Sequence, residues 1–201
     1  MTGAGIKSFD ALPYNRREIL RYAMCPGCDE PKMLSLMEEC IKECDRSASF
    51  SSRVSYVVLP VVSLNTDTGL VDMEHIKVTS RDLAGNLQGC KSVVVFAATV
   101  GPGIDRLIKK YSGLDPVKAL FMQAIGAERA ETMCNAFCGS FPAQLRPRFS
   151  PGFGDLELLV QPDVLRVTNA KKNLSITLDD GMLMTPSKSV TAFAGSGEDL
   201  T

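Results

Sequence analysis

Apolar residues recur with helical spacing in several segments of the chain, and short runs of β-branched residues separate them. Ile19, Leu20 and Tyr22 show this spacing near the N-terminus. A second helix is expected at about Pro31 to Asp45, where the apolar residues form one stripe. Proline and glycine in the intervening CPGCDEP segment end the first helix before the second begins.

The longest helix is predicted between Asp115 and Gly139. Asp115 is a good N-cap residue, Pro116 suits the first turn, and the helix should continue to about Cys138 and end at the glycine. A shorter helix is expected at Ser80 to Leu87.

Three regions have the composition of strands. Arg53 to Leu64 is rich in β-branched residues, and Pro60 within it predicts an edge strand or a bulge. KSVVVFAATV predicts a buried strand, followed by a glycine turn at Gly101–Gly103 and a helix. The C-terminal region predicts short strands around a Thr-Pro-Ser turn. Helices and strands in this order indicate an α+β fold.

Length and charge restrict the domain organisation and the class of partner. A chain of 201 residues with 45% hydrophobic residues suits one domain, expected at 13–195, between a flexible N-terminus at 1–12 and a flexible tail at 196–201. The formal net charge of −1 argues against binding to nucleic acid or to an acidic membrane surface. The sequence contains no signal-peptide pattern and no apolar run of about 20 residues, so a cytoplasmic protein is expected.

The seven cysteines predict free thiols in a reducing compartment. Cys25-Pro-Gly-Cys28 has the spacing of a zinc half-site or a redox dithiol, because both sulfurs can point to one side of a tight turn. Two further pairs are spaced by one helical turn on apolar stripes, where cysteine behaves as a small hydrophobic residue: Cys40 with Cys44, and Cys134 with Cys138. No metal site is predicted from these pairs.

No catalytic side chain is predicted. His75 is the single histidine, and it has no serine or cysteine partner at a recognisable spacing. VGPGID follows a strand and opens a helix like a phosphate-binding loop, but it lacks the lysine of a P-loop, which favours a structural turn.

RFSPGFGD, residues 148–155, has the composition of a binding loop. Pro151 fixes the backbone, Gly152 removes a side chain, and Phe153 supplies a flat face. The forked guanidinium of Arg148 suits a carboxylate, and open backbone groups beside the glycine suit the edge of a purine. We therefore expect this loop to bind a nucleoside that carries an amino acid.

Two glutamates on the long helix are further candidates. Glu128 and Glu131 lie about one helical turn apart. The alanines around them have small side chains, which would let another group approach the helix closely. A binding role and solvated helix charges explain these glutamates equally well.

The loop motif resembles the arginine, three residues, glycine, tyrosine motif in the activation domain of vitamin B12-dependent methionine synthase, the part that binds S-adenosylmethionine. Three further segments, NRREILRY, GCKSVVVFAATVGPGIDRLIKKYS and MTPSKSVTAF, resemble free-standing versions of that domain in the same order. The resemblance implies an α+β domain with a mixed or antiparallel sheet and flanking helices.

The resemblance also implies a function and a set of cofactor-binding residues. Such a module binds S-adenosylmethionine and supports reductive methylation of a Co(II) corrinoid on a separate cobalamin-dependent methionine synthase or related methyltransferase, with flavodoxin or a ferredoxin as the reductant. The residues that match are Arg148, which grips the carboxylate, Pro151, Gly152 and Phe153 on the adenosine side, and Glu131 as an acidic contact.

The chain departs from the family pattern at several positions. Phe153 lacks the hydroxyl of the family tyrosine, and no histidine follows the arginine motif. Two alternatives therefore stay open: a non-catalytic binding or scaffolding partner of a corrinoid protein, and a thiol or metal protein that uses Cys25 and Cys28.

Overall fold

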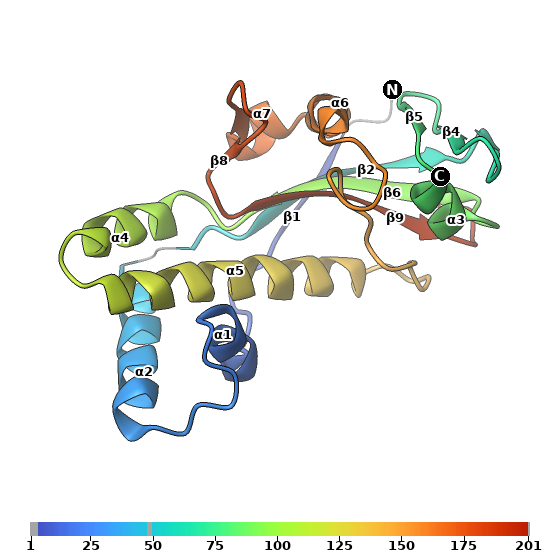
Figure 1. Cartoon of the computed structure of the whole chain (residues 1–201). Coiled ribbons are helices and arrows are strands. Elements are labelled where there is room, and N and C mark those ends of the chain that lie inside the picture. The colour runs from blue at the N-terminus through green and yellow to red at the C-terminus, as the bar shows by residue number, and fades with distance from the viewer. Residues whose placement is uncertain (1–3, 48–49, 201) are drawn as a thin grey trace.

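A four-stranded antiparallel sheet with the strand order β1-β2-β6-β9 forms the centre of the molecule (Figure 1). The computed structural model describes residues 4–47 and 50–200. The strands of this sheet are β1 (Gly5–Ser8), β2 (Arg53–Pro60), β6 (Ser92–Thr99) and β9 (Ser189–Ser196). Two small sheets lie outside it, formed by β3 (Ser63–Leu64), β4 (Leu70–Asp72) and β5 (Lys77–Thr79), and by β7 (Thr177–Leu178) and β8 (Met184–Thr185).

Helices cover both faces of the central sheet. They are α1 (Arg16–Tyr22), α2 (Pro31–Arg46), α3 (Arg81–Leu87), α4 (Gly103–Ser112), α5 (Pro116–Cys138), α6 (Gln161–Val167) and α7 (Ala170–Leu174), with the 3₁₀ turn η1 (Leu158–Val160) before α6. In Figure 1, α5 lies beneath the sheet with α1 and α2 below it, and α6 and α7 lie above. Within the described part of the chain, no helix has the length and apolar character needed to cross a membrane.

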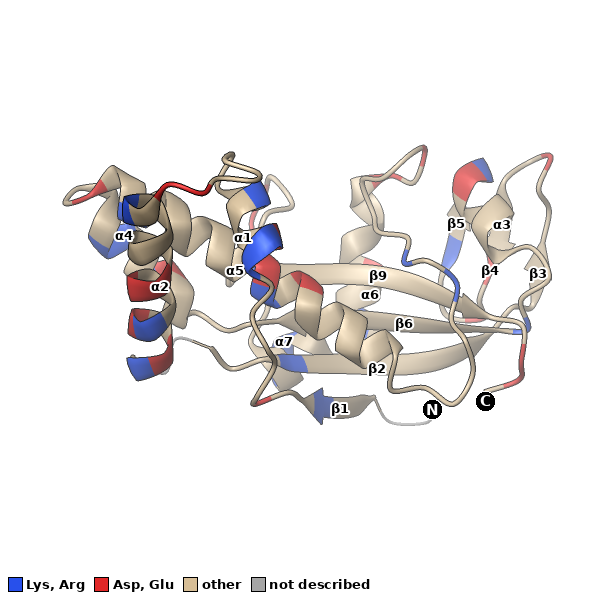
Figure 2. Ribbon diagram, turned by 90° about the horizontal axis from the view of Figure 1, so that it is seen from below, with Lys and Arg blue, Asp and Glu red and all other residues tan. Residues whose placement is uncertain are grey.

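The central strand β6 separates two apolar cores. Every residue of β6 is buried. Because side chains alternate across a strand, Val94 and Phe96 pack into the core with α5, whereas Val93 and Val95 pack with α3 and α6 on the other face. Charged residues lie mainly on the helices and loops, and the strands β2, β6 and β9 carry few (Figure 2). The predicted α+β fold with an antiparallel sheet and flanking helices is confirmed.

The predicted helix boundaries agree closely with the structure. The longest helix, α5, spans Pro116–Cys138, and the Asp115 carboxylate accepts a hydrogen bond from the Lys118 amide at 3.0 Å. That bond satisfies one of the amide groups left free in the first turn of a helix. The first two helices and α3 also lie where the spacing of apolar residues placed them.

The prediction for Pro60 was right about an edge, whereas one prediction of strand length was wrong. Among the described residues, β1 pairs only with Arg53–Tyr56 of β2, so the half of β2 that ends at Pro60 is an edge on that side; its pairing with β6 is regular, and Pro60 lies opposite Ser92. The strands around the Thr185-Pro186-Ser187 turn were expected to be short, but β9 continues for 8 residues beyond it. Pairing along the whole of β6 explains this length.

The expected loose ends contain ordered contacts. Gly5–Ser8 forms the edge strand β1, although flexibility was predicted for 1–12. At the other end, the Leu200 amide donates to the Ser92 hydroxyl at 3.0 Å. Residues 1–3 and 201, which belong to the same two predictions, lie outside the described residues.

A buried ion pair on α5 holds the chain that leads into α1. Glu128 and Arg129 are only 1% and 4% exposed, and Arg129 Nε lies 2.8 Å from Glu128 Oε2. The guanidinium also donates to the carbonyl oxygens of Leu12 at 2.7 Å and Pro13 at 2.5 Å. Glu128 Oε1 accepts a hydrogen bond from the Asn15 amide at 2.9 Å. Both members of the ion pair therefore hold the segment that precedes α1.

Replacing Arg129 with Met should destabilise the fold strongly, since it leaves the Glu128 carboxylate buried without a counter-charge. We expect a loss of about 3–5 kcal/mol in the free energy of unfolding, measured by urea denaturation. The double variant Glu128→Gln/Arg129→Met removes both charges and should recover part of this loss. Equal destabilisation of the single and double variants would show that the charge on Glu128 does not matter.

Candidate functional site

Backbone pairing with the edge strand β9 fixes the position of Arg148. The Phe149 amide donates to the Phe193 carbonyl at 2.9 Å, and the Phe193 amide donates back at 2.8 Å. The Arg146 amide donates to the Gly195 carbonyl at 2.7 Å. The segment therefore runs along β9 as a short added strand, with Arg148 between its two points of attachment.

The side chain of Arg148 crosses to α5. Its Nη2 atom donates to Glu131 Oε2 at 2.7 Å and to Asn135 Oδ1 at 3.0 Å. Glu131 and Asn135 lie four residues apart and so on the same face of the helix. The Arg148 side chain is 21% exposed and that of Glu131 is 46% exposed. Two of the residues predicted from sequence are thus brought together as an ion pair.

A hollow of about 440 Å³ lies beside this ion pair. Its lining residues are Glu131, Asn135, Pro147, Arg148, Ser150 and Val190. One wall comes from α5, another from the segment before the proline-glycine bend, and Val190 belongs to β9. The volume falls within the range of about 300–1,000 Å³ that is typical of small-molecule sites.

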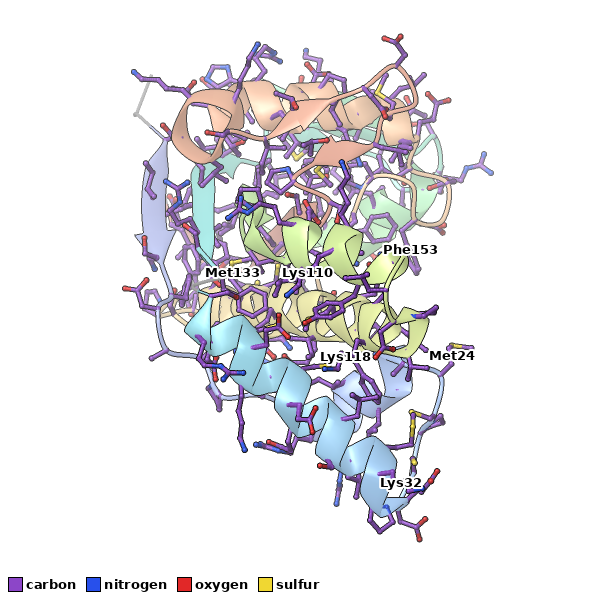
Figure 3. The ribbon with its side chains drawn as sticks, turned by 90° about the vertical axis from the view of Figure 1, so that its left-hand side faces the viewer. Met24, Lys32, Lys110, Lys118, Met133 and Phe153 are labelled. Atoms are coloured by element: carbon purple, nitrogen blue, oxygen red, sulfur yellow. The ribbon has the colours of Figure 1, made fainter. Side chains whose placement is uncertain are left out.

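The bend after Arg148 has the rigid conformation expected from its composition. Gly152 has φ +86°, and a Cβ there would lie 3.2 Å from Leu158 Cδ1. Pro151 is buried, whereas Phe153 is 66% exposed and packs edge-on against Phe149 with ring centroids 5.3 Å apart. In Figure 3, Phe153 lies at the outer edge of the molecule.

The backbone amides of the bend are not open, contrary to expectation. The Gly152 amide donates to the Leu156 carbonyl at 2.8 Å, and the Phe153 amide donates to the Ser150 carbonyl at 3.1 Å. These bonds close the bend on itself. Recognition of a purine edge by these two amides would require the bend to rearrange, whereas the ring of Phe153 is already accessible.

Asp155 attaches the far end of the bend to α3. Its carboxylate accepts hydrogen bonds from the Ser80 hydroxyl, the Arg81 amide at 2.8 Å and the Asp82 amide at 3.2 Å. Gly154 allows this approach, because a Cβ there would lie 2.3 Å from Asp82 Oδ2. The hydrogen bond from Ser80, followed by those from the amides, holds the pKa of Asp155 below its usual range.

The cysteines next to the site are structural. Cys134 is fully buried on α5, and burial raises the pKa of its thiol to about 12 despite the nearby Arg148 guanidinium. Burial also raises the pKa of Cys138. Both are therefore neutral thiols at neutral pH, which makes them poor nucleophiles and poor metal ligands.

Five residues of the site region were not found from the sequence. Four of them line the hollow: Asn135, Pro147, Ser150 and Val190. The fifth, Lys188, lies two residues before Val190 with its stem over α5. A Cβ at Gly126 would lie 3.0 Å from Lys188 Cγ, so the glycine makes room for the lysine. Burial lowers the pKa of Lys188, an effect that Asp105 opposes. Of these residues, only Asn135 could have been identified from the sequence, because it lies one helical turn after Glu131.

The other candidate residues lie away from the hollow. Glu128 belongs to the buried pair with Arg129 and does not line it. Cys25 and Cys28 lie on the connection between α1 and α2. Within residues 4–47 and 50–200, no group of three or more His, Cys, Asp or Glu side chains is placed to hold a metal ion.

The arrangement is suited to binding and orientation. A guanidinium fixed from β9 and α5 offers a carboxylate site, and Glu131 supplies a negative charge. The predicted site residues Pro151, Gly152 and Phe153 follow Ser150 in the chain but do not line the hollow. Among the described residues that line the hollow there is no nucleophile paired with a base.

No protein-family model and no curated protein matches the chain by sequence. Among solved structures, the chain is similar to the MetH reactivation domain bound to AdoHcy. The TM-score is 0.68 at 12% sequence identity, and the match covers 100% of this chain and 81% of the other. A likeness at this identity establishes a shared fold, as the resemblance of the sequence motifs predicted.

Removing the carboxylate of Asp155 should loosen the bend without unfolding the chain. In Asp155→Ala we expect several-fold faster hydrogen exchange of the Arg81 and Asp82 amides, which lose their acceptor. Asp163→Ala is the control, since Asp163 makes an exposed pair with Arg166. Because the pKa of Asp155 is lowered in the folded state, its contribution is present above the ordinary aspartate pKa and is lost as the pH falls below it. Unchanged exchange of both amides would contradict this role.

Proposed function

We propose that the chain binds S-adenosylmethionine in the hollow beside Arg148 and acts as a stand-alone reactivation module. Its partner would be the Co(II) corrinoid of a separate cobalamin-dependent methionine synthase or related methyltransferase. The observation that carries the proposal is the fixed guanidinium of Arg148 at a ligand-sized hollow. The likeness of the fold to a domain solved with AdoHcy adds support.

The free donors of Arg148 fit the amino-acid end of the ligand. Both of its hydrogen bonds to side-chain oxygens leave from Nη2. The guanidinium also interacts with the buried Cys134 side chain, and we propose that a carboxylate binds the donors that these contacts leave. Glu131 holds the guanidinium in place, which lowers the entropy cost of that contact.

The remaining parts of the ligand also have suitable neighbours. Glu131 is half exposed beside the hollow, and its negative charge favours a positive sulfonium. The ring of Phe153 offers a flat apolar face to a purine. The predicted set of Arg148, Pro151, Gly152, Phe153 and Glu131 therefore remains our proposed binding site, and the lining residues Asn135, Pro147, Ser150 and Val190 are added.

In the proposed methyl transfer, the role of this protein is to position the reactants. S-adenosylmethionine supplies an already activated methyl group when bound, and the electron would come from a flavodoxin or ferredoxin-type reductant. The residues of this chain would hold the carboxylate, orient the ligand and exclude water. The absence of a catalytic dyad among the described lining residues is compatible with such a role.

An apolar surface next to the bend is available to the corrinoid partner. Phe153 is 66% exposed, Leu159 63% and Leu158 38%. Exposed apolar side chains that adjoin a ligand site favour contact with a second protein. We propose that the partner covers these side chains.

Arg148→Ala should weaken binding of S-adenosylmethionine by roughly 10- to 100-fold, as expected for the loss of a hydrogen bond to a charged group. Isothermal titration calorimetry measures the change. Arg146→Ala is the matched control, because Arg146 lies on the same segment and its side chain donates only weakly, to the Gln88 carbonyl at 3.4 Å. Arg148→Lys should restore little, since an ammonium lacks the planar fork. A wild-type protein that gives no binding heat would remove the proposal.

The proposed support of corrinoid methylation is tested with a corrinoid protein. Adding this chain, S-adenosylmethionine and reductant to a partner protein in the Co(II) state should convert its absorption spectrum to that of methylcobalamin. Arg148→Ala should slow this conversion. Binding of the partner without conversion, at saturating ligand, would instead identify a non-catalytic scaffolding protein.

A further inference from the structure

The Cys25-Pro-Gly-Cys28 segment forms a tight turn that the proposed function does not use. The Cys28 amide donates to the Cys25 carbonyl at 3.2 Å, which closes the turn. Pro26 fixes φ at the first central position, and Gly27 has φ +72° at the second. This combination is typical of a type II β-turn.

The geometry of such a turn matches that of a disulfide. The first and last Cα atoms of a β-turn lie within about 7 Å of each other. Disulfides bridge Cα separations of about 4.4–6.8 Å. A bond between Cys25 and Cys28 therefore requires rotation of two side chains and little movement of the backbone.

The surroundings distinguish this pair from the other cysteines. Cys25 and Cys28 are both half-buried, and a Cβ built at Gly27 would meet no atom within 4 Å, so the turn faces open space. Met24, the preceding residue, is 84% exposed and projects outward in Figure 3. The buried cysteines are Cys40, Cys44, Cys90 and Cys134. An oxidant in solution reaches the turn far more easily than these residues.

A closed metal site is less compatible with the same observations. Structural zinc needs four ligands, and the turn supplies two. Within the described residues no third His, Cys, Asp or Glu joins them. Burial, and then the neighbouring Cys28, raises the pKa of Cys25, which disfavours a metal-binding thiolate at this residue.

We infer that Cys25 and Cys28 form a reversible dithiol–disulfide site. Oxidised glutathione, or another small disulfide, is the oxidant. The Cys25 or Cys28 thiolate attacks one sulfur of glutathione disulfide and releases one glutathione thiol; the second cysteine then attacks the mixed disulfide and releases the other. Two S–H bonds are lost and one S–S bond is formed, while the oxidant gains two electrons and two protons.

The site lies at the joint between two helices. The Cys25 amide donates to the Leu20 carbonyl at 3.0 Å at the end of α1, and α2 begins at Pro31. Both cysteines pack against the core that α1, α2 and α5 share. The disulfide would restrain the connection between α1 and α2 in the oxidised state only. It would not change the hollow beside Arg148.

The test is oxidation of the full, folded, reduced chain with glutathione disulfide at mildly alkaline pH, followed by alkylation in denaturant, which exposes the buried cysteines, and intact-mass measurement. We expect a loss of the mass of two hydrogen atoms and alkylation of five of the seven cysteines. Peptide mapping should find Cys25 linked to Cys28. Cys28→Ser should instead retain one glutathione on Cys25, and Cys138→Ser, at another half-buried cysteine, should leave the bridge unchanged.

Three results would overturn the inference. The first is a wild-type chain that keeps glutathione as a stable mixed disulfide without an internal bridge. The second is a mapped bridge between different cysteines, and the third is no reaction at the turn. Because mapping is done on the wild-type chain, the outcome does not depend on whether the variants fold, and it is independent of S-adenosylmethionine binding.

Discussion

The pairing of Phe149 with Phe193 is the constraint on which the candidate site depends. These two residues exchange backbone hydrogen bonds and so attach an irregular, proline-rich segment to the edge of a rigid sheet. Arg148, next to the pair, is thereby held across from α5. A guanidinium on a free loop would lose much of its binding energy to ordering. Here the Arg148 side chain is already ordered before a ligand binds, because Glu131 fixes its guanidinium and β9 fixes its backbone.

The long helix α5 connects the site with the rest of the fold. One part of its surface carries Glu131 and Asn135 toward the hollow, and another carries the buried Glu128–Arg129 pair that binds the entry to α1. The same helix fills the core beneath β6. Its polar residues therefore differ in role according to the face they occupy. Glu128 is a structural charge, whereas Glu131, three residues later, is half exposed beside a ligand-sized hollow.

The proposed function and the dithiol turn occupy separate regions and make separate demands. The hollow offers charge and orientation, which suit a ligand that brings its own activated group. The turn at Cys25 and Cys28 offers accessible thiols, which the hollow lacks because Cys134 is buried and neutral. This separation makes it possible to study redox state and ligand binding independently of one another.

The sequence by itself determined the helices and the chemistry of the loop. Apolar spacing and an Asp115 cap are local signals, so the bounds of α5 were predicted closely, and Pro151 with Gly152 identified the bend. Strand order and ligand-site partners depend on contacts between distant segments. Only the tertiary structure set the strand order β1-β2-β6-β9 and paired Arg148 with Glu131. It also directed the Gly152 and Phe153 amides to carbonyl oxygens of the bend, because backbone hydrogen bonds in a loop depend on how its ends are anchored.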